Sequence, residues 1–227
     1  MSGRTAPQRT SRVAERVSAV GRRLAPVLAA AVWLALVASG LGILLRYSLA
    51  PGRPGNPPAV WPAGSRLDRP ANRYTLVLAV HPHCPCTRAS LDELAVIMAR
   101  GSGRVAARVL FVQPEGFSEQ WAQTDMWRTV RSIPGATPVL DPRGREARRF
   151  GAFTSGQVVL YDPEGRLAFS GGVTGARGHR GANAGLGAVL DCVERGGAAA
   201  TRSPVFGCPL QAPPSTHGKE AHACPRS

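Results

Sequence analysis

A run without charge is the feature that most limits what this chain can form. Residues 24–45, LAPVLAAAVWLALVASGLGILL, carry no charged side chain over 22 residues. A helix of this length crosses about 30 Å of hydrocarbon, whereas the apolar region of a cleaved signal peptide has only about 7–15 residues. We therefore expect an uncleaved transmembrane helix, with signal-peptide cleavage near Ala50 as the alternative.

Basic residues before this run set the expected orientation of the helix. Residues 1–23 carry six arginines against a single acidic residue, Glu15, and show no hydrophobic period, so we expect a poorly ordered tail. The positive-inside rule keeps such a tail in the cytoplasm. The chain after Arg46 is then expected to be extracytoplasmic and anchored to the cytoplasmic (inner) membrane by a single pass. In that compartment disulfides form and persist.

The net charge of +14 does not by itself indicate a nucleic-acid-binding protein. Of the 28 basic residues only Lys219 is a lysine, and the arginines are spread along the chain. No zinc finger, helix-turn-helix or aromatic RNA-binding motif accompanies them, so we expect no nucleic acid among the partners. The 44% apolar composition is enough for one packed domain.

Composition divides the rest of the chain into three parts. Residues 46–73 are rich in proline and glycine, which predicts a linker. Residues 74–196 contain regular apolar patterns and are expected to form the folded domain. Residues 197–227 lack such patterns and are rich in Ala, Pro, Ser and Gly, which predicts a C-terminal low-complexity tail.

Within residues 74–196, short apolar runs alternate with amphipathic ones. The segments with strand character are YTLVLAV, RVAARVLFVQP, TPVLDP, GQVVLYD and RLAFSGGV. The segments with helical character are CPCTRASLDELAVIMARG, TDMWRTVRSI, REARRFGAF and NAGLGAVLDCVERGG. This order predicts an α/β domain with a mixed central sheet flanked by helices.

Two cysteines lie where the first strand gives way to the first helix of this domain. We expect Cys84 at the N-cap, with Pro85 at the first helical position. Unpaired N–H groups and the helix dipole favour a thiolate there. A thiolate can attack disulfides, reduce peroxides or bind metals, and the position of Cys84 leaves these three open.

The spacing of the second cysteine is unusual for a redox pair. Residues two apart on a helix lie about 200° apart, so a disulfide between Cys84 and Cys86 would be a small, strained and easily reduced ring. Cys84 could instead be resolved by a distant thiol such as Cys208. Cys192 is expected to be a packed residue or a partner for Cys208.

Two histidines precede the cysteines and add a second interpretation. When protonated, His81 and His83 could stabilise the thiolate, and when neutral they could bind a metal. Two thiols and two imidazoles within six residues would suit Cu(I) or Zn(II), although the spacing departs from the usual zinc pattern. The candidate metal ligands are Cys84, Cys86 and His83.

Several segments resemble the thioredoxin-like superfamily. HCPCTRASL is similar to the WCPPCRAEL type of active-site segment, and LDPRGREARRFGAF and VVLYDPEGRLAFSGGV resemble later segments of TlpA-type domains. Peroxiredoxin-like domains are also similar, and the combination looks like RedB-type proteins. The resemblance covers residues from about 74 to 196 and implies a three-layer thioredoxin-like fold.

Carried over residue by residue, the resemblance assigns the attacking role to Cys84. Thr87 occupies the position of the family's resolving cysteine, so that role passes to Cys86 only by conjecture. Gly156 occupies the position of a cis-proline that faces the active-site sulfur in thioredoxins. A glycine there would leave room for a metal or a second sulfur beside Cys84.

The same resemblance bears on two alternatives, a thiol peroxidase and a copper protein. Peroxiredoxins have a threonine three residues before the reactive cysteine, where this chain has His81. Sco-type copper proteins use a histidine in a later loop, near Thr154 here, so copper would need His81, His83 or His179. The glycine-rich loop before the last helix is expected to bring Arg177 and His179 toward Cys84.

We therefore predict a membrane-anchored thiol-disulfide oxidoreductase that acts through Cys84 and Cys86. Its expected partner is a protein thiol or disulfide, and no cofactor is expected. The alternatives are a Sco-like copper-binding protein or metallochaperone, with copper as its cofactor, and a thiol peroxidase.

Overall fold

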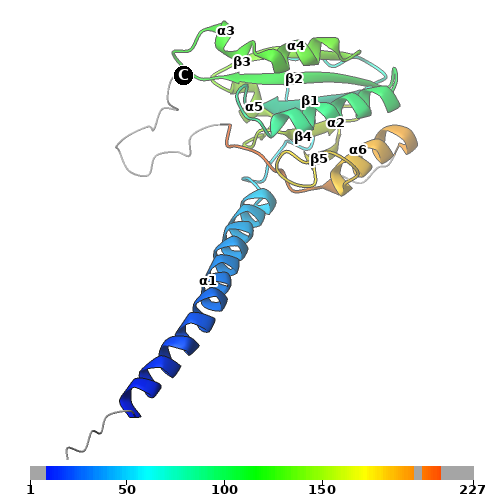
Figure 1. Cartoon of the computed structure of the whole chain (residues 1–227). Helices are drawn as coiled ribbons and strands as arrows, with labels where there is room; N and C mark the ends of the chain where they lie inside the picture. Colours follow the sequence, from blue (N-terminus) through cyan, green and yellow to red (C-terminus); the bar gives the residue numbers. More distant parts are fainter. Residues whose placement is uncertain (1–8, 197–200, 211–227) are drawn as a thin grey trace, which may run out of the picture. The chain divides into compact units, whose positions relative to one another are not determined.

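The computed structural model describes residues 9–196 and 201–210, and the chain divides into two compact units, Met1–Tyr47 and Ser48–Ser227 (Figure 1). Helix α1 covers Arg9–Leu49. Its part Ala25–Leu49 has 25 residues with a mean hydropathy of 2.4. By length and composition this one segment of the described chain can cross a membrane, a test that an N-terminal signal sequence also passes.

The helix begins earlier than the sequence predicted. It begins at Arg9 rather than at residue 24, so residues 9–23 are helical and not a poorly ordered tail. Residues 9–20 contain neither glycine nor proline. A helix that nucleates in the apolar run therefore extends through them, because each added residue costs far less than nucleation.

The second unit is built on a mixed sheet whose strands lie in the order β3-β2-β1-β4-β5-β6. The bounds of the strands are β1 Tyr74–Val80, β2 Val105–Gln113, β3 Ala136–Pro142, β4 Gln157–Tyr161, β5 Leu167–Gly172 and β6 Thr201–Arg202. The first three strands are parallel because helices connect them, whereas β4 runs antiparallel to β1 and to β5. The predicted mixed sheet is confirmed.

Helices lie on both faces of this sheet. Their bounds are α2 Thr87–Arg100, α3 Glu119–Ala122, α4 Asp125–Ser132, α5 Arg145–Arg149 and α6 Ala184–Arg195. Only the short α3 was not predicted. Asn183 caps α6 as expected, because its side chain accepts a hydrogen bond from the N–H of Leu186 at 3.0 Å.

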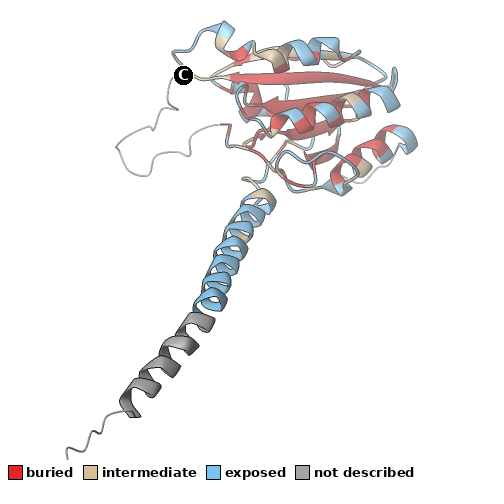
Figure 2. Ribbon diagram, viewed as in Figure 1, coloured by how far each residue is buried: buried red, intermediate tan, exposed pale blue. Residues whose placement is uncertain are grey.

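The alternation of side chains along the strands produces two apolar cores. Strands β1, β2, β4 and β5 are buried along nearly their whole length, whereas the edge strand β3 is partly exposed (Figure 2). Leu76 and Leu78 of β1 point into the larger core, which α2, α4 and α6 cover. Val77 and Ala79 point into the smaller core, which α5 covers in part. The result is a three-layer α/β domain, with β1 at the centre of the sheet.

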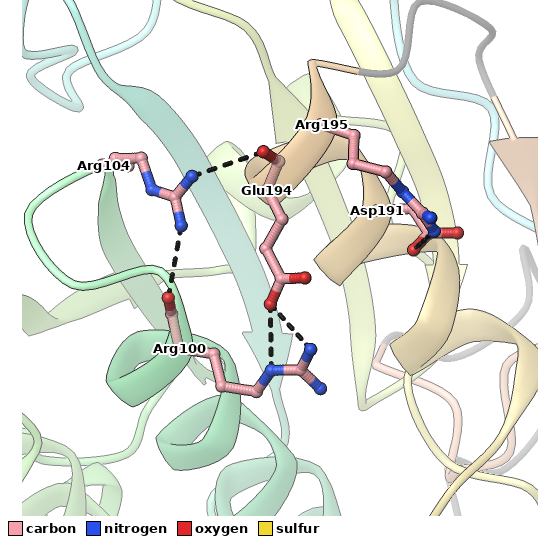
Figure 3. A network of polar contacts seen from close by, with 5 residues as sticks. All are labelled: Arg100, Arg104, Asp191, Glu194 and Arg195. Atoms are coloured by element: carbon pink, nitrogen blue, oxygen red, sulfur yellow. Dashed lines mark hydrogen bonds and ion pairs between the residues drawn. The ribbon is translucent and has the colours of Figure 1, made fainter.

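A polar network joins the C-terminal ends of α2 and α6 (Figure 3). The guanidinium of Arg100 binds the carboxylate of Glu194 at 2.7 Å. Arg104 donates to the main-chain oxygens of Arg100 and Glu194. These contacts lie on the surface and fix the far end of α2, opposite the end that carries the cysteines.

Part of the Pro/Gly-rich linker predicted for residues 46–73 packs on the domain. Leu67 belongs to the smaller core, and the hydroxyl of Tyr161 donates to the oxygen of Pro58 at 3.0 Å. Val60 forms a bridge with Arg166. Because α5 is too short to cover the smaller core, this proline-rich segment covers the rest.

The C-terminal part of the chain differs from its prediction. Residues 197–200 and 211–227 lie outside the described residues, but residues 201–210 between them belong to the fold. β6 pairs parallel to β5, and Val205 and Leu210 are buried. The prediction of a low-complexity tail is therefore wrong for residues 201–210. We call the part of this stretch that follows β6, residues 203–210, the C-terminal strap.

Candidate functional site

The two cysteines lie in a turn between β1 and α2. The N–H of Cys84 donates to the oxygen of His81 at 3.1 Å, and the N–H of Thr87 donates to the oxygen of Cys84 at 3.0 Å. Helix α2 begins at Thr87, and its N-cap is Cys86 rather than Cys84. The predicted N-cap was wrong because the His81 turn holds Cys84 outside the helix.

The C-terminal strap brings a third cysteine to this turn. The Sγ atoms of Cys84 and Cys208 lie 3.1 Å apart, and Cys84 is only 2% exposed. This separation is a contact rather than a bond, since a disulfide is about 2.05 Å long. Among the cysteines that the structure describes, Cys208 is thus the distant thiol that the fold places against Cys84.

Backbone pairing holds the strap in place. The N–H of Ser155 donates to the oxygen of Cys208 at 2.8 Å, and the N–H of Leu210 donates to the oxygen of Phe153 at 2.9 Å. Thr154 and Pro209 form an antiparallel bridge. The strap therefore lies along the segment before β4 as an extra strand would.

Gly207 allows this close approach. A Cβ atom at this position would lie 1.9 Å from the oxygen of Ser155, which no side chain tolerates without movement of the backbone. The oxygen of Gly207 accepts a hydrogen bond from the guanidinium of Arg177. Glycine at 207 is thus a structural requirement for the contact between the two sulfurs.

Hydrogen bonds to Cys84 stabilise its thiolate. The thiol of Cys208 is the main donor, and together with the N–H groups of Cys208 and Cys86 and the hydroxyl of Thr87 it outweighs burial and lowers the pKa of Cys84 to about 4. The same contact raises the pKa of Cys208. At neutral pH the pair therefore holds one proton, on Cys208, and the negative charge lies on Cys84.

A Thr87→Val chain tests this origin of the thiolate. We expect the pKa of Cys84 to rise from about 4 to about 5, because one hydrogen bond to a charged group is lost. Ultraviolet thiolate absorbance against pH measures it. Thr75→Val is the matched control, since the buried Thr75 hydroxyl has no hydrogen-bond partner. An equal shift in both variants, or none in Thr87→Val, would show that the Thr87 hydroxyl does not stabilise the thiolate.

Cys86 lies beside the same sulfur and is half-buried. Burial raises the pKa of Cys86, the charge of Cys84 raises it further, and Arg177 lowers it. In the reduced site Cys86 is therefore protonated. Cys192, by contrast, is packed in the larger core under β5, as predicted.

Both histidines lie in the cysteine turn, and their proposed action on the thiolate stays a prediction. Burial lowers the pKa of His81, so its ring is neutral, and its Nδ1 accepts from the N–H of His83 at 3.2 Å. The ring of His83 packs on Trp121 and its Nε2 lies 3.0 Å from the Trp121 oxygen. Both histidines thus serve to shape the turn.

Gly156 has a conformation that excludes the proline of thioredoxins. Its φ is +92°, whereas proline requires about −65°, and the described residues contain no cis peptide bond. Its N–H donates to the oxygen of Ala79 at 2.8 Å, and a Cβ there would lie 2.8 Å from the Oγ of Ser90. The second sulfur beside Cys84 belongs to Cys208. The residue before Gly156, Ser155, holds Cys208 through its main-chain N–H.

Of the two loop residues expected at the site, one reaches it. Arg177 binds the strap at Gly207 and affects both Cys86 and Cys208. His179 is exposed, and its Nδ1 lies 2.9 Å from the oxygen of Arg177. His179 therefore lies in its own turn, away from the sulfurs.

The geometry gives copper no ready set of ligands. Within residues 9–196 and 201–210, no group of three or more His, Cys, Asp or Glu side chains is arranged to hold a metal ion. Of the proposed set of Cys84, Cys86 and His83, the imidazole of His83 packs on Trp121. Copper binding stays a prediction.

Two contributions to the site were missed from the sequence. The Oγ of Ser155 accepts from the N–H of His81 at 2.8 Å and lies 2.7 Å from the Oγ1 of Thr87, which ties the strap side to the cysteine turn. Trp121 belongs to the unpredicted helix α3 and packs against one side of the turn. The short apolar run VFGC before Pro209 was the one signal that the strap could pair as a strand.

The central strand, the cysteine turn at the start of a helix, and the later hairpin followed by α6 define a thioredoxin-like fold. No protein-family profile and no curated protein matches the chain. Among solved structures, an uncharacterized conserved protein from Geobacillus kaustophilus has a TM-score of 0.52 and 16% identity over 74% of this chain and 95% of that chain.

Two further structures are similar at low identity. A hypothetical protein from Sinorhizobium meliloti has a TM-score of 0.52 and 22% identity over 72% of this chain and 94% of that chain. A secreted thiol-disulfide isomerase from Corynebacterium glutamicum has a TM-score of 0.40 and 17% identity over 55% of this chain and 73% of that chain. Likeness at these identities concerns the fold, and the closeness to RedB-type proteins stays a prediction.

Proposed function

We propose that this chain is a membrane-anchored, extracytoplasmic thiol-disulfide oxidoreductase that acts on a protein thiol or disulfide. The observation that carries the proposal is the contact of 3.1 Å between the Sγ atoms of Cys84 and Cys208. One sulfur is a thiolate and the other keeps its proton, which is the state from which a dithiol exchanges with a disulfide. The basic residues that precede the uncharged run 24–45 support the orientation.

The chemistry needs two sulfurs and no further group. The Cys84 thiolate attacks one sulfur of a partner disulfide, which breaks the S–S bond and releases one partner thiolate. Cys208 then loses its proton and attacks the Cys84 sulfur of the mixed disulfide. The second partner thiolate leaves, two electrons have passed to the partner, and Cys84 and Cys208 are joined. A partner dithiol reverses these steps.

We expect a partner sulfur to approach Cys84 from the cavity beside the cysteine turn. A cavity of about 200 Å³ borders the cysteine turn. It is lined by Pro82, His83, Cys84, Pro85, Arg88, Thr124, Asp125 and Met126. Cys84 is therefore covered by the strap but still borders an open cavity.

Oxidation of a Cys86→Ser chain tests the assignment of the couple. We expect the full-length protein in detergent to form a disulfide between Cys84 and Cys208 when a small-molecule disulfide oxidises it, because the contact between these two sulfurs does not involve the Cys86 side chain. Mass spectrometry of the digested protein identifies the pair. If this chain forms no bond between Cys84 and Cys208, the proposed couple is wrong and Cys86 is the remaining candidate.

A further inference from the structure

The site contains one more sulfur than a two-electron couple uses. Cys84 contacts the thiol of Cys208 from the strap. The thiol of Cys86, two residues along the same turn, also interacts with the Cys84 sulfur. These two neighbours come from different parts of the chain. Cys84 is thus the sulfur that both other thiols can reach.

Oxidation changes the charge that Cys86 experiences. In the reduced site the Cys84 thiolate opposes ionisation of Cys86, while Arg177 favours it. A disulfide between Cys84 and Cys208 removes the negative charge, but Arg177 stays, because its guanidinium is held by the oxygen of Gly207. Cys86 therefore becomes easier to ionise after the couple is oxidised, when a disulfide lies beside it.

We propose that Cys86 is a third exchanging thiol, which attacks the Cys84 sulfur of the Cys84–Cys208 disulfide and releases Cys208. The bond between Cys84 and Cys208 breaks, a bond between Cys84 and Cys86 forms, and Cys208 takes up the proton that Cys86 gives up. No electron enters or leaves. This inference rests on the proposed function, since it needs Cys84 and Cys208 as the first couple.

The consequence of this exchange is that the strap loses its covalent link. While Cys84 and Cys208 are joined, residues 207–210 are fixed to the cysteine turn. After the exchange they are held without a covalent bond, by main-chain pairing with residues 153–155, by Arg177 and by the burial of Leu210. The oxidised protein then has a small ring between Cys84 and Cys86, which a partner thiol opens more readily than an unstrained disulfide.

Disulfide mapping of the oxidised full-length protein in detergent tests the exchange. Trypsin cleaves after Arg73 and Arg88, so one peptide holds both Cys84 and Cys86 and is lighter by two hydrogens when they are joined. The sample is quenched with acid, its free thiols are labelled with maleimide, and molecules that carry one disulfide are selected. In these molecules we expect the light peptide, and we expect Cys208 to carry the label. In a Cys86→Ser chain, labelling of Cys208 in such molecules should fall at least about tenfold.

The controls separate this inference from the function on which it rests. Cys192→Ala removes a cysteine outside the site and should behave as the unchanged chain does. If the oxidised unchanged chain contains only the Cys84–Cys208 pair and its Cys208 is never labelled, the exchange is wrong while the couple stands. If the Cys86→Ser chain forms no Cys84–Cys208 pair, the couple itself is wrong.

Discussion

A Gly207→Ala chain is expected to lose most of the coupling between Cys84 and Cys208 although it keeps both thiols. The added Cβ would lie 1.9 Å from the oxygen of Ser155, so the strap must move away from the segment before β4. Overpacking of this kind costs about 1–3 kcal/mol, which corresponds to a loss of about 5–150-fold in the docked strap. The rate at which the Cys84–Cys208 disulfide forms should fall by the same factor.

The pKa of Cys84 should change in the same experiment. The thiol of Cys208 is the main cause of the low value of about 4, so an undocked strap should raise it toward that of an ordinary thiol. Thiolate absorbance against pH follows this change. Gly187→Ala is the matched control, because a Cβ at Gly187 of α6 meets no atom within 4 Å. Normal disulfide formation in Gly207→Ala would mean that the strap does not position Cys208.

A Cys84→Ser chain is expected to show no thiol-disulfide exchange above the uncatalysed rate. Cys84 is the thiolate at neutral pH, whereas Cys86 and Cys208 both keep their protons. Serine has nearly the same size but is not ionised, so the loss reports on chemistry rather than on packing. Reduction of a protein disulfide by the full-length chain in detergent, with a dithiol as electron donor, measures the rate.

The buried Cys192 provides the comparison for this variant. Cys192→Ala removes a thiol that lies under β5 and has no part in the site, so its exchange rate should match that of the unchanged chain. Exchange by Cys84→Ser at a substantial fraction of the normal rate would transfer the attacking role to Cys86 or Cys208.

Local sequence patterns were sufficient for the central part of the fold. Continuous apolar runs such as residues 74–80 are buried strands, and the helical period around Leu91 and Leu94 marks the face of α2 that enters the core. The position of Cys84 after the central strand followed from the same patterns. These elements depend on short-range periodicity, which is visible in a single sequence.

The parts that were missed depend on pairing between distant segments. The strap carries little periodicity of its own, and its place is decided by hydrogen bonds to residues 153–155 and by the space at Gly207. The proline-rich segment around Leu67 was missed for the same reason. The contact between Cys84 and Cys208 therefore became visible only in the tertiary structure.

The lifetime of the mixed disulfide with a protein substrate tests most directly whether Cys84 attacks and Cys208 resolves. Full-length Cys208→Ser and Cys86→Ser chains, mixed with the same disulfide-containing protein, are quenched over time and separated by non-reducing electrophoresis. We expect the mixed disulfide at Cys84 to persist longer in Cys208→Ser, because the thiol in contact with Cys84 is the one removed. A mixed disulfide that instead persists longer in Cys86→Ser would assign the resolving role to Cys86 and refute the couple of Cys84 and Cys208.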